Sequence, residues 1–387
     1  MRIIFFTTKL NFETGGYSTP ELDLKLRTMK ALGHDVRVIT LFPGINRGAL
    51  PSAYPVIEER VGTSGQIAIQ LGVRRILKKY ERDADVFHVD GTVFLYGAGL
   101  YRFLGGKIPV LAGLNREQSS FPPFRPKRER FSFTRFIANI RRNIRYATEK
   151  TLGVFLANHI DLFTFCSPML RDLYIRFGLQ SRKCVFNYDF LDAEEALTHK
   201  RGSRQRHGRP FAIFTAGRMV WEKGLDLALV AVAKLRHKDG VRLIVGGDGP
   251  ELGTLKKLAD TLGIAGITEF TGWLPMDKLF AYMNEADCFV SPCWRPEIGS
   301  ALAFHAMSVG VPNIVPAGGG LEWFVGGASA TFRAFDTDDL AKKIALLMND
   351  EALGAALTEK GFTRVKELDY HEPAKILDKM LREIARA

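Results

Sequence analysis

The chain has 387 residues, 46% of them apolar, and its 54 Lys and Arg residues against 42 Asp and Glu give a formal charge of +12. This length predicts two domains with a core in each, and it excludes a disordered tail protein and a small disulfide scaffold. The four cysteines show no CxxC pair and no histidine at zinc-ligand spacing, so we expect a reducing compartment, no metal site and no structural disulfide.

The first half alternates short apolar runs with helical periods, which is the pattern of βαβ units in a parallel sheet. Its strands are predicted at residues 3–6, 36–40, 85–89 and 109–114. Between the first two, Leu22, Leu26 and Met29 fall on one helical face, and Gly33 fits a helix C-cap. The N-terminal apolar run is too short for a secretory signal, so we expect no export.

Positive charge is concentrated in this half and just after it. Residues 1–195 carry a net charge of +10, and residues 196–210 add five basic side chains and no acidic one. Residues 211–387 carry a net charge of −3. No nucleic-acid-binding motif accompanies the basic residues, so we expect no nucleic-acid partner.

The densest basic segment, residues 125–150, interleaves its arginines with aromatic and aliphatic residues. It fits either an anionic membrane surface or a solvated helix with one face in the core. The candidate membrane contacts are Arg141, Arg142 and Arg145. The longest uncharged run, 298–321, is broken by prolines and a glycine triplet, so it does not read as a membrane span. We expect a cytoplasmic protein that is soluble or peripheral at the inner face of the cell membrane.

The pattern of strands and helices restarts in the second half, with strands at 211–216, 243–246, 267–270 and 287–291. We therefore expect an α/β protein with two Rossmann-like, doubly wound parallel-sheet domains that face a cleft. The predicted parts are an N-terminal domain at 1–195, an interdomain linker at 196–210, a C-terminal domain at 211–365 and a C-terminal helix at 366–387 that packs back on the first domain. Ligands of such sheets bind beyond the carboxyl ends of the strands, here after Phe6, Ala216, Gly246 and Ser291.

The loop after Ala216 carries Gly217, Arg218, Lys223 and Gly224 and leads into a helix. Glycine lets the backbone approach a ligand closely, and two cations with a helix N-terminus behind them suit a diphosphate. The other interpretation of this segment alone is a loop with two solvated cations.

A second glycine-rich loop, 246–250, also follows a strand. It lacks the third glycine of the dinucleotide-binding fingerprint, because Leu252 stands at that position. We therefore predict a tight turn with close backbone packing, and no nicotinamide cofactor.

A third loop follows the strand that ends at Ser291 and carries Glu297. A helix is predicted to begin near Ser300, which can cap it, and to end at Gly310. Glu297 would then lie at the carboxyl edge of the sheet, next to the backbone amides that follow it. A lone acidic residue in such a loop has surface decoration as its other interpretation.

These loops follow one another in a definite order along the chain. The matching positions are Gly15 and Gly16, Leu32-Gly33-His34-Asp35-Val36, Gly217-Arg218 with Lys223-Gly224, Gly247-Asp248-Gly249-Pro250, Phe270-x-Gly272, Ser291-Pro292 with Glu297, Ala306-Met307, Gly310 and Pro312. In this order they resemble the retaining GT-B glycosyltransferases of family 4. The resemblance is strong from 211 to 325 and weaker from 1 to 195.

The resemblance implies a UDP- or GDP-sugar donor held mainly by the C-terminal domain, an acceptor on the N-terminal domain, and no required metal or cofactor. It implies that Arg218 and Lys223 neutralise the donor diphosphate as the glycosidic bond breaks, and that Glu297 faces the hydroxyl groups of the donor sugar. The further implied donor contacts are Gly16, Gly217 and the amides of Ile298, Gly299 and Ser300.

Two positions depart from the pattern of the family. His305 stands where the family has a second glutamate that grips the ribose, so it is a candidate ribose ligand or a packed helix residue. Asn115 stands where the family has a histidine near the reacting sugar, and an amide cannot relay a proton. Glu117 and His88 are therefore further acceptor-side candidates, although His88 also fits a buried structural histidine.

The sequence thus predicts a retaining enzyme that moves a hexose-type sugar from a UDP- or GDP-sugar to an acceptor hydroxyl. The acceptor is expected to be a glycan or a lipid-linked molecule, in polysaccharide, cell-wall or glycolipid assembly. One alternative is a non-catalytic nucleotide-sugar-binding partner of another glycosyltransferase, which the residues at 305 and 115 favour. Another is a different GT-B enzyme, such as an epimerase or a phosphorylase.

Overall fold

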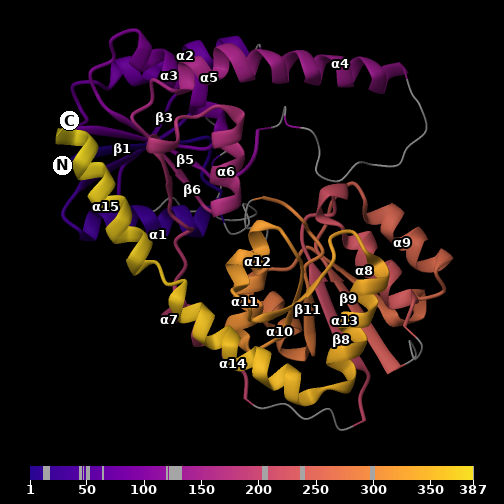
Figure 1. Cartoon of the computed structure of the whole chain (residues 1–387). Coiled ribbons are helices and arrows are strands. Elements are labelled where there is room, and N and C mark those ends of the chain that lie inside the picture. The colour runs from indigo at the N-terminus through magenta and orange to yellow at the C-terminus, as the bar shows by residue number, and fades with distance from the viewer. Residues whose placement is uncertain are drawn as a thin grey trace. The chain divides into compact units, whose positions relative to one another are not determined.

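The computed structural model describes residues 1–11, 18–42, 46, 48, 53–62, 65–118, 121, 133–202, 208–235, 240–296 and 301–386. Its internal contacts divide the chain into two units (Figure 1). Unit 1 comprises Met1–Pro122, Arg128–Leu191 and Tyr370–Ala387, and unit 2 is built on Asp192–Asp369. Each unit has a parallel sheet and an apolar core of its own.

The strands of unit 1 are almost wholly apolar, because helices bury a parallel sheet on both faces. In the described part of this unit they all run parallel, in the order β3-β2-β1-β4-β5-β6-β7. Their bounds are β1 Arg2–Thr7, β2 Asp35–Thr40, β3 Val56–Glu58, β4 Val86–Asp90, β5 Val110–Leu114, β6 Leu162–Phe165 and β7 Cys184–Phe186. The order reverses where β1 pairs with β4, so the loops that follow these two strands run in opposite directions.

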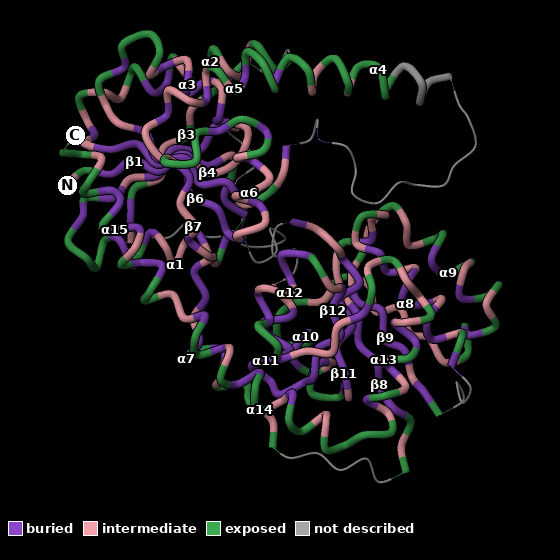
Figure 2. The backbone as a smooth tube through the Cα atoms, viewed as in Figure 1, coloured by how far each residue is buried: buried purple, intermediate pink, exposed green. Residues whose placement is uncertain are grey.

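Helices cover both faces of this sheet (Figure 1). Their bounds are α1 Ser18–Ala31, α2 Gln66–Lys79, α3 Leu95–Phe103, α4 Phe133–Thr148, α5 Val154–Ala157, α6 Pro168–Phe177 and α15 His371–Arg386. Helices α1 and α15 lie together on one face, while α2, α3 and α5 lie together on the other. The described turns of α4 extend beyond the sheet and are mostly exposed (Figure 2).

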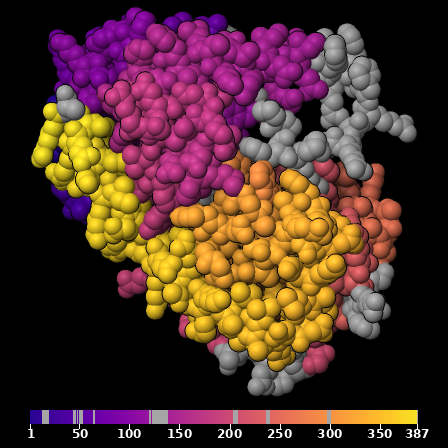
Figure 3. All heavy atoms as spheres, viewed as in Figure 1, coloured from indigo at the N-terminus to yellow at the C-terminus, as the bar shows by residue number. Residues whose placement is uncertain are grey.

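The C-terminal helix α15 belongs to unit 1, although the chain reaches it through unit 2. Its Leu377 joins Leu26 of α1 in the core, and His34 Nε2 lies 2.6 Å from Asp378 Oδ1. Figure 3 shows the C-terminal residues against the surface of unit 1, next to residues from the start of the chain. The helix lies within 366–387, where the sequence predicts a helix that packs on this domain.

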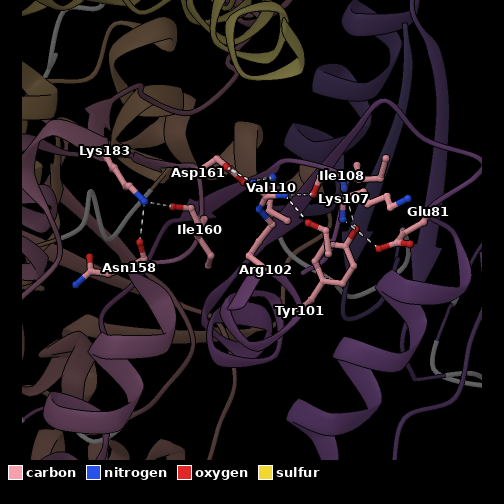
Figure 4. Close-up of polar contacts among 11 residues, drawn as sticks. Glu81, Tyr101, Arg102, Lys107, Ile108, Val110, Asn158, Ile160, Asp161 and Lys183 are labelled. Carbon is pink, nitrogen blue, oxygen red and sulfur yellow. Dashed lines mark hydrogen bonds and ion pairs between the residues drawn. The ribbon is translucent and has the colours of Figure 1, made fainter. Parts of the chain in front are cut away.

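A network of polar contacts closes the amino-terminal edge of the sheet of unit 1 (Figure 4). Arg102 donates to the carbonyl oxygen of Gly106 at 2.6 Å and to Asp161 Oδ1 at 2.8 Å, and Asp161 Oδ2 accepts the N–H of Val110 at 2.8 Å. Lys183 Nζ donates to two carbonyl groups just before β6, at 2.7 and 2.8 Å. These bonds satisfy backbone groups that the sheet leaves unpaired, so the polar contacts at this edge stabilise the fold.

Unit 2 repeats the same strand order with its own parallel sheet, which confirms the two doubly wound sheets predicted from the sequence. In its described part the order is β10-β9-β8-β11-β12-β13, and it reverses between β8 and β11. The strand bounds are β8 Phe211–Ala216, β9 Val241–Gly246, β10 Thr268–Gly272, β11 Cys288–Val290, β12 Asn313–Pro316 and β13 Ser329–Phe332. The helix bounds are α7 Ala193–Leu197, α8 Leu225–Ala233, α9 Leu252–Thr261, α10 Met276–Glu285, α11 Leu302–Val309, α12 Gly320–Val325, α13 Thr337–Asn349 and α14 Glu351–Glu367.

The described part of the segment 196–210, predicted as a linker, packs on unit 2. Arg201 donates to carbonyl groups just past the C-termini of α10, at 2.6 Å, and of α11, at 3.0 Å. Arg209 forms a two-bond ion pair with Asp287, at 2.6 and 2.7 Å. By its internal contacts unit 2 includes residues from Asp192 onward, so these two arginines and their partners belong to the same unit.

Candidate functional site

The loops singled out in the sequence emerge where the strand order reverses in each sheet. In unit 2, residues 217–223 follow β8, and the loop that begins at Ser291 follows β11, its neighbour in the sheet. In unit 1, His88 and Asp90 lie in β4, which pairs with β1. In open α/β sheets this is the place where ligands bind.

Two glycine loops of unit 2 pack backbone against backbone. Gly217 has φ 155° and Gly247 has φ 115°, and a Cβ on Gly247 would lie 2.0 Å from the carbonyl oxygen of Gly217. Met219 donates its N–H to the carbonyl oxygen of Asp248 at 2.7 Å. The predicted tight turn with close backbone packing is confirmed, and it fixes the backbone on both sides of Arg218.

The two cations predicted to meet the diphosphate lie on this loop. Arg218 is exposed, whereas Lys223 is half-buried and its Cδ lies 4.0 Å from where a Cβ of Gly217 would stand. Gly224 follows with φ 69°, and a Cβ there would lie 3.1 Å from the carbonyl oxygen of Pro292. Glycine at 224 thus brings the loops after β8 and β11 together, and Gly217 packs against the loop after β9, beside two positive charges.

The loop after β11 is held on both sides. Cys293 Sγ donates to the carbonyl oxygen of Glu222 at 3.5 Å, and Trp294 Nε1 donates to that of Ala317 at 3.1 Å. The predicted donor contacts that lie outside the described residues are Gly16, Glu297, Ile298, Gly299 and Ser300. Their roles stay predictions.

His305, the candidate ribose ligand, lies inside the helical packing of unit 2. It is 5% exposed, and its ring meets the ring of Phe280 edge-on with centroids 5.3 Å apart. His199 stacks on the same phenyl ring at 3.9 Å. Burial, with a smaller contribution from His199, lowers the pKa of His305 to about 4, so the imidazole is neutral at pH 7. This environment favours the packing interpretation, and the ribose contact stays a prediction.

Unit 1 holds a partly open pocket at the carboxyl ends of its central strands. Gly113 of β5 stands in register between Asp90 of β4 and Thr164 of β6. A Cβ on Gly113 would lie 3.2 Å from Asp90 Oδ1 and 3.3 Å from His88 Cε1, so glycine lets these two side chains lie close to β5 at the base of the pocket. The charged, imidazole and amide side chains that line it are Glu21, Lys25, His88, Asp90, Asn115, Asn187 and Asp189.

Three carboxyl groups and one lysine meet in this pocket. Lys25 Nζ lies 3.9 Å from Glu21 Oε1, one turn away on α1. Glu21 and Asp189 are hydrogen-bonded to each other, and burial raises the pKa of Glu21 well above its usual range and that of Asp189 to about 6. Burial also raises the pKa of Asp90, against the opposing pull of Lys25 and Arg116. Burial in the pocket thus favours the protonated form of these carboxyl groups, most strongly at Glu21.

Two of the three acceptor-side candidates line the same pocket. His88 is 2% exposed, and its Nδ1 has no hydrogen-bond partner among the described residues. Burial, followed by the charge of Lys25, lowers the pKa of His88 well below its usual value, so the ring is neutral. Asn115 follows β5 and lines the pocket, whereas Glu117 lies further along this loop and is not among the lining residues that are described.

The described part of the basic segment forms α4 and its continuation. Arg141 is exposed, Arg142 is half-buried, and Arg145 donates to Glu149 Oε1 at 2.7 Å. Exposed apolar side chains accompany these arginines. They are Ile140, Ile144, Leu152 and Phe155.

Within the described ranges, no group of His, Cys, Asp and Glu side chains is arranged to hold a metal ion. No helix of these ranges has the length and apolar character needed to cross a membrane. The four cysteines are all buried, and none of them forms a disulfide.

Two family models match consecutive parts of the chain. Residues 25–195 match the model described as Glycosyltransferase Family 4, and residues 198–364 match the one described as Glycosyl transferases group 1. The chain belongs to the glycosyltransferase family whose two parts these models describe. The first match falls on the part of the sequence that forms most of unit 1, and the second falls within unit 2.

Curated relatives of this glycosyltransferase match it over part of its length. The GDP-mannose-dependent alpha-(1-6)-phosphatidylinositol monomannoside mannosyltransferase of Mycobacterium tuberculosis is 35% identical over 172 residues, which cover 41% of this chain and 45% of that protein. The lipopolysaccharide core biosynthesis glycosyltransferase LpsE of Rhizobium meliloti is 30% identical over 151 residues, which cover 38% and 43%. The chain thus spans less than half the length of these curated relatives.

Solved structures match it over nearly its whole length. Anabaena Alr3699/HepE, in complex with UDP, gives a TM-score of 0.76 at 19% identity and covers 99% of this chain and 100% of that one. The sucrose-phosphate synthase of Thermosynechococcus elongatus gives 0.78 at 16% identity, with 99% and 98% covered. Likeness at such low identity shows the fold, and with the two parallel sheets it identifies the GT-B fold.

Proposed function

We propose that this glycosyltransferase moves a hexose-type sugar from a UDP- or GDP-sugar to a hydroxyl group of a glycan or lipid-linked acceptor, with retention of configuration. The reaction would serve polysaccharide, cell-wall or glycolipid assembly. The observation that carries the proposal is the pair of interlocked glycine loops in unit 2, which present Arg218 and Lys223 where the strand order reverses.

The donor assignment combines this geometry with what the relatives bind. A diphosphate needs cations and close backbone, and the loop from Gly217 to Gly224 supplies both. The name of the Mycobacterium relative specifies GDP-mannose, and Alr3699/HepE was solved with UDP, so both nucleotides are candidates. His305 and the loop that carries Glu297 complete the proposed donor site, in the roles that the family resemblance implies.

In the proposed mechanism, the bond between the anomeric carbon and the diphosphate oxygen breaks while the acceptor hydroxyl attacks on the same face. The departing phosphate oxygen takes the proton of that hydroxyl. Negative charge therefore grows on the diphosphate, and Arg218 and Lys223 stabilise it more in the transition state than in the bound donor. No residue is required as a separate general base, which agrees with an amide at Asn115.

We assign the acceptor to unit 1 and the contact with an anionic membrane surface to α4. The pocket at the carboxyl ends of β4 and β5 contains two of the three predicted acceptor-side residues, His88 and Asn115. Helix α4 combines Arg141 and Arg142 with exposed Ile144, so both charge and apolar area face solvent there.

The donor proposal is tested by the melting temperature of the chain with nucleoside diphosphates. We expect UDP or GDP to raise the melting temperature in proportion to the logarithm of its concentration, and ADP to have a much smaller effect, because a ligand that binds only the folded state stabilises it. Equal shifts with all three diphosphates would show a general anion site, and no shift with any of them would contradict the proposal.

A further inference from the structure

The pocket of unit 1 contains buried polar atoms that the protein itself leaves without partners. His88 Nδ1 has none among the described residues, although His88 is 2% exposed. Asn187 Oδ1 has none either, while its amide nitrogen donates to the carbonyl oxygen of Pro373 at 3.1 Å. Buried polar groups are nearly always hydrogen-bonded, so both atoms have hydrogen-bonding capacity left for a group that enters the pocket.

Gly113 keeps the base of the pocket open between these groups. Its neighbours in register, Asp90 and Thr164, would lie 3.2 and 3.6 Å from an added Cβ, through Oδ1 and Oγ1 respectively. An oxygen acceptor and a hydroxyl thus flank Gly113 on either side. We call this base of the pocket, where no side chain of β5 separates Asp90 from Thr164, the cradle.

The charges around the cradle are unbalanced. Lys25 is the one positively charged side chain among the described lining residues, and three carboxyl groups surround it. Glu21 accepts the N–H of Phe190 and shares a hydrogen bond with Asp189, so these two carboxyl groups are already oriented. The lining therefore offers three carboxyl groups and one ammonium group, but no cation that is free of nearby carboxyl groups.

We propose that this pocket binds an uncharged, hydroxyl-rich sugar ring of the acceptor and rejects a ring that carries a phosphate. The proposal rests on the proposed glycosyltransferase function and adds the substrate class of its acceptor half. Ring hydroxyls both donate and accept, so they can satisfy the carboxylates, Lys25, His88 Nδ1 and Asn187 Oδ1 together. A phosphate group is an acceptor only and would enter beside Asp90 and Asp189, where its charge is repelled in a poorly solvated site.

The test is ligand-observed NMR of the full chain with two matched sets of probes. One set is the methyl glycosides of mannose, glucose and galactose, and the other is the 6-phosphates of the same sugars, all at millimolar concentration. We expect at least one neutral glycoside to bind at least about tenfold more tightly than its 6-phosphate. Equal or tighter binding of the phosphates, or no binding by any neutral glycoside, would overturn the inference.

Three variants place the binding in this pocket. Asp90→Asn and Asp189→Asn should each lower the affinity for the neutral glycoside by about tenfold, because each variant loses a carboxylate acceptor. Each should also reduce the ratio of that affinity to the affinity for the 6-phosphate. Gly113→Ala should weaken binding without any change of charge, since the added methyl fills the cradle. The control Asp172→Asn removes an exposed carboxylate on α6 and should change neither affinity. Unchanged binding in all three pocket variants would contradict the proposal.

The same samples separate this inference from the donor proposal. Calorimetry with UDP and GDP measures the donor site of unit 2 alone. If UDP or GDP binds but the chain does not prefer neutral glycosides over their phosphates, the acceptor inference is wrong and the donor proposal is still supported. If the chain prefers neutral glycosides but binds neither nucleotide, the donor proposal is wrong and the acceptor inference is still supported.

Discussion

At the scale of single residues, the account depends most on Arg218 and Lys223. Replacing either by Ala should lower the turnover of nucleotide sugar by about a hundredfold, because each cation stabilises charge that grows in the transition state. The measurement is nucleotide release from UDP- and GDP-sugars. The matched control is Lys342→Ala, an exposed cation on α13, which should keep the wild-type rate. Wild-type turnover in both loop variants would remove their catalytic role.

The buried ring of His305 should make the free energy of unfolding depend on pH. Burial lowers its pKa to about 4, below the value of about 6.5 in an unfolded chain. Between these two values the unfolded chain binds more protons, so this contribution is complete above pH 6.5 and is lost as the pH falls toward 4. By linkage the loss of stability reaches about 2 kcal/mol at pH 5.

Urea denaturation at pH 7 and pH 5 checks this prediction. His305→Gln should lose about 2 kcal/mol less than the wild type between the two pH values, because the amide does not titrate. His371→Gln, which changes an exposed histidine, serves as the control. The same pH dependence in wild type and His305→Gln would show that the ring is not held neutral by its surroundings.

The residues of the proposed donor loops could be predicted from the sequence, because the glycines and cations lie close together along the chain. The carboxyl groups of the proposed acceptor pocket could not. Glu21 and Asp189 come from α1 and from the end of β7, and nothing local marks their hydrogen bond. The one available signal was the four-residue spacing of Glu21 and Lys25 on a helix. The orientation of His305 was also hidden, because α11 is apolar on all sides and gives no polar face to read.

At the scale of elements, the long apolar runs such as β1 and β8 were readily predicted, whereas β3, β6, β7 and β13 were not. These strands have three or four residues each, too few to show a period or a pair of turn signals. The prediction of a linker at 196–210 rests only on the polar composition of that segment. Its arginines are polar, yet Arg201 and Arg209 bond to groups of unit 2 that are distant in the sequence.

Helix α4 is the element whose role is most open to test. If it meets an anionic membrane, the double variant Arg141→Gln, Arg142→Gln should bind phosphatidylglycerol vesicles at least about tenfold more weakly, at roughly 1 kcal/mol for each arginine. The measurement is the amount of protein that sediments with these vesicles and with neutral phosphatidylcholine vesicles. The control, Lys375→Gln with Lys379→Gln on α15, removes two exposed charges from the same unit. Equal binding to neutral and anionic vesicles would leave α4 as a solvated helix.

At the scale of the whole molecule, each unit contributes a different kind of site. Unit 2 offers cations and close backbone, which suit a diphosphate, and unit 1 offers carboxyl groups around an open cradle, which suit hydroxyl groups. The described lining of the pocket in unit 1 does not share the excess of basic residues, because it contains one lysine, Lys25, and three carboxyl groups. The net charge of +12 therefore does not imply an anionic group at the acceptor hydroxyl.

Mass spectrometry of transfer tests the central claim most directly. The chain is incubated with UDP- or GDP-hexoses and a mixture of neutral glycan and glycolipid acceptors. We predict that one acceptor gains the mass of a hexose while the matching nucleoside diphosphate is released in equal amount, and that Arg218→Ala with Lys223→Ala abolishes both. Binding of the nucleotide sugar without transfer to any acceptor would contradict the account and favour a non-catalytic binding partner.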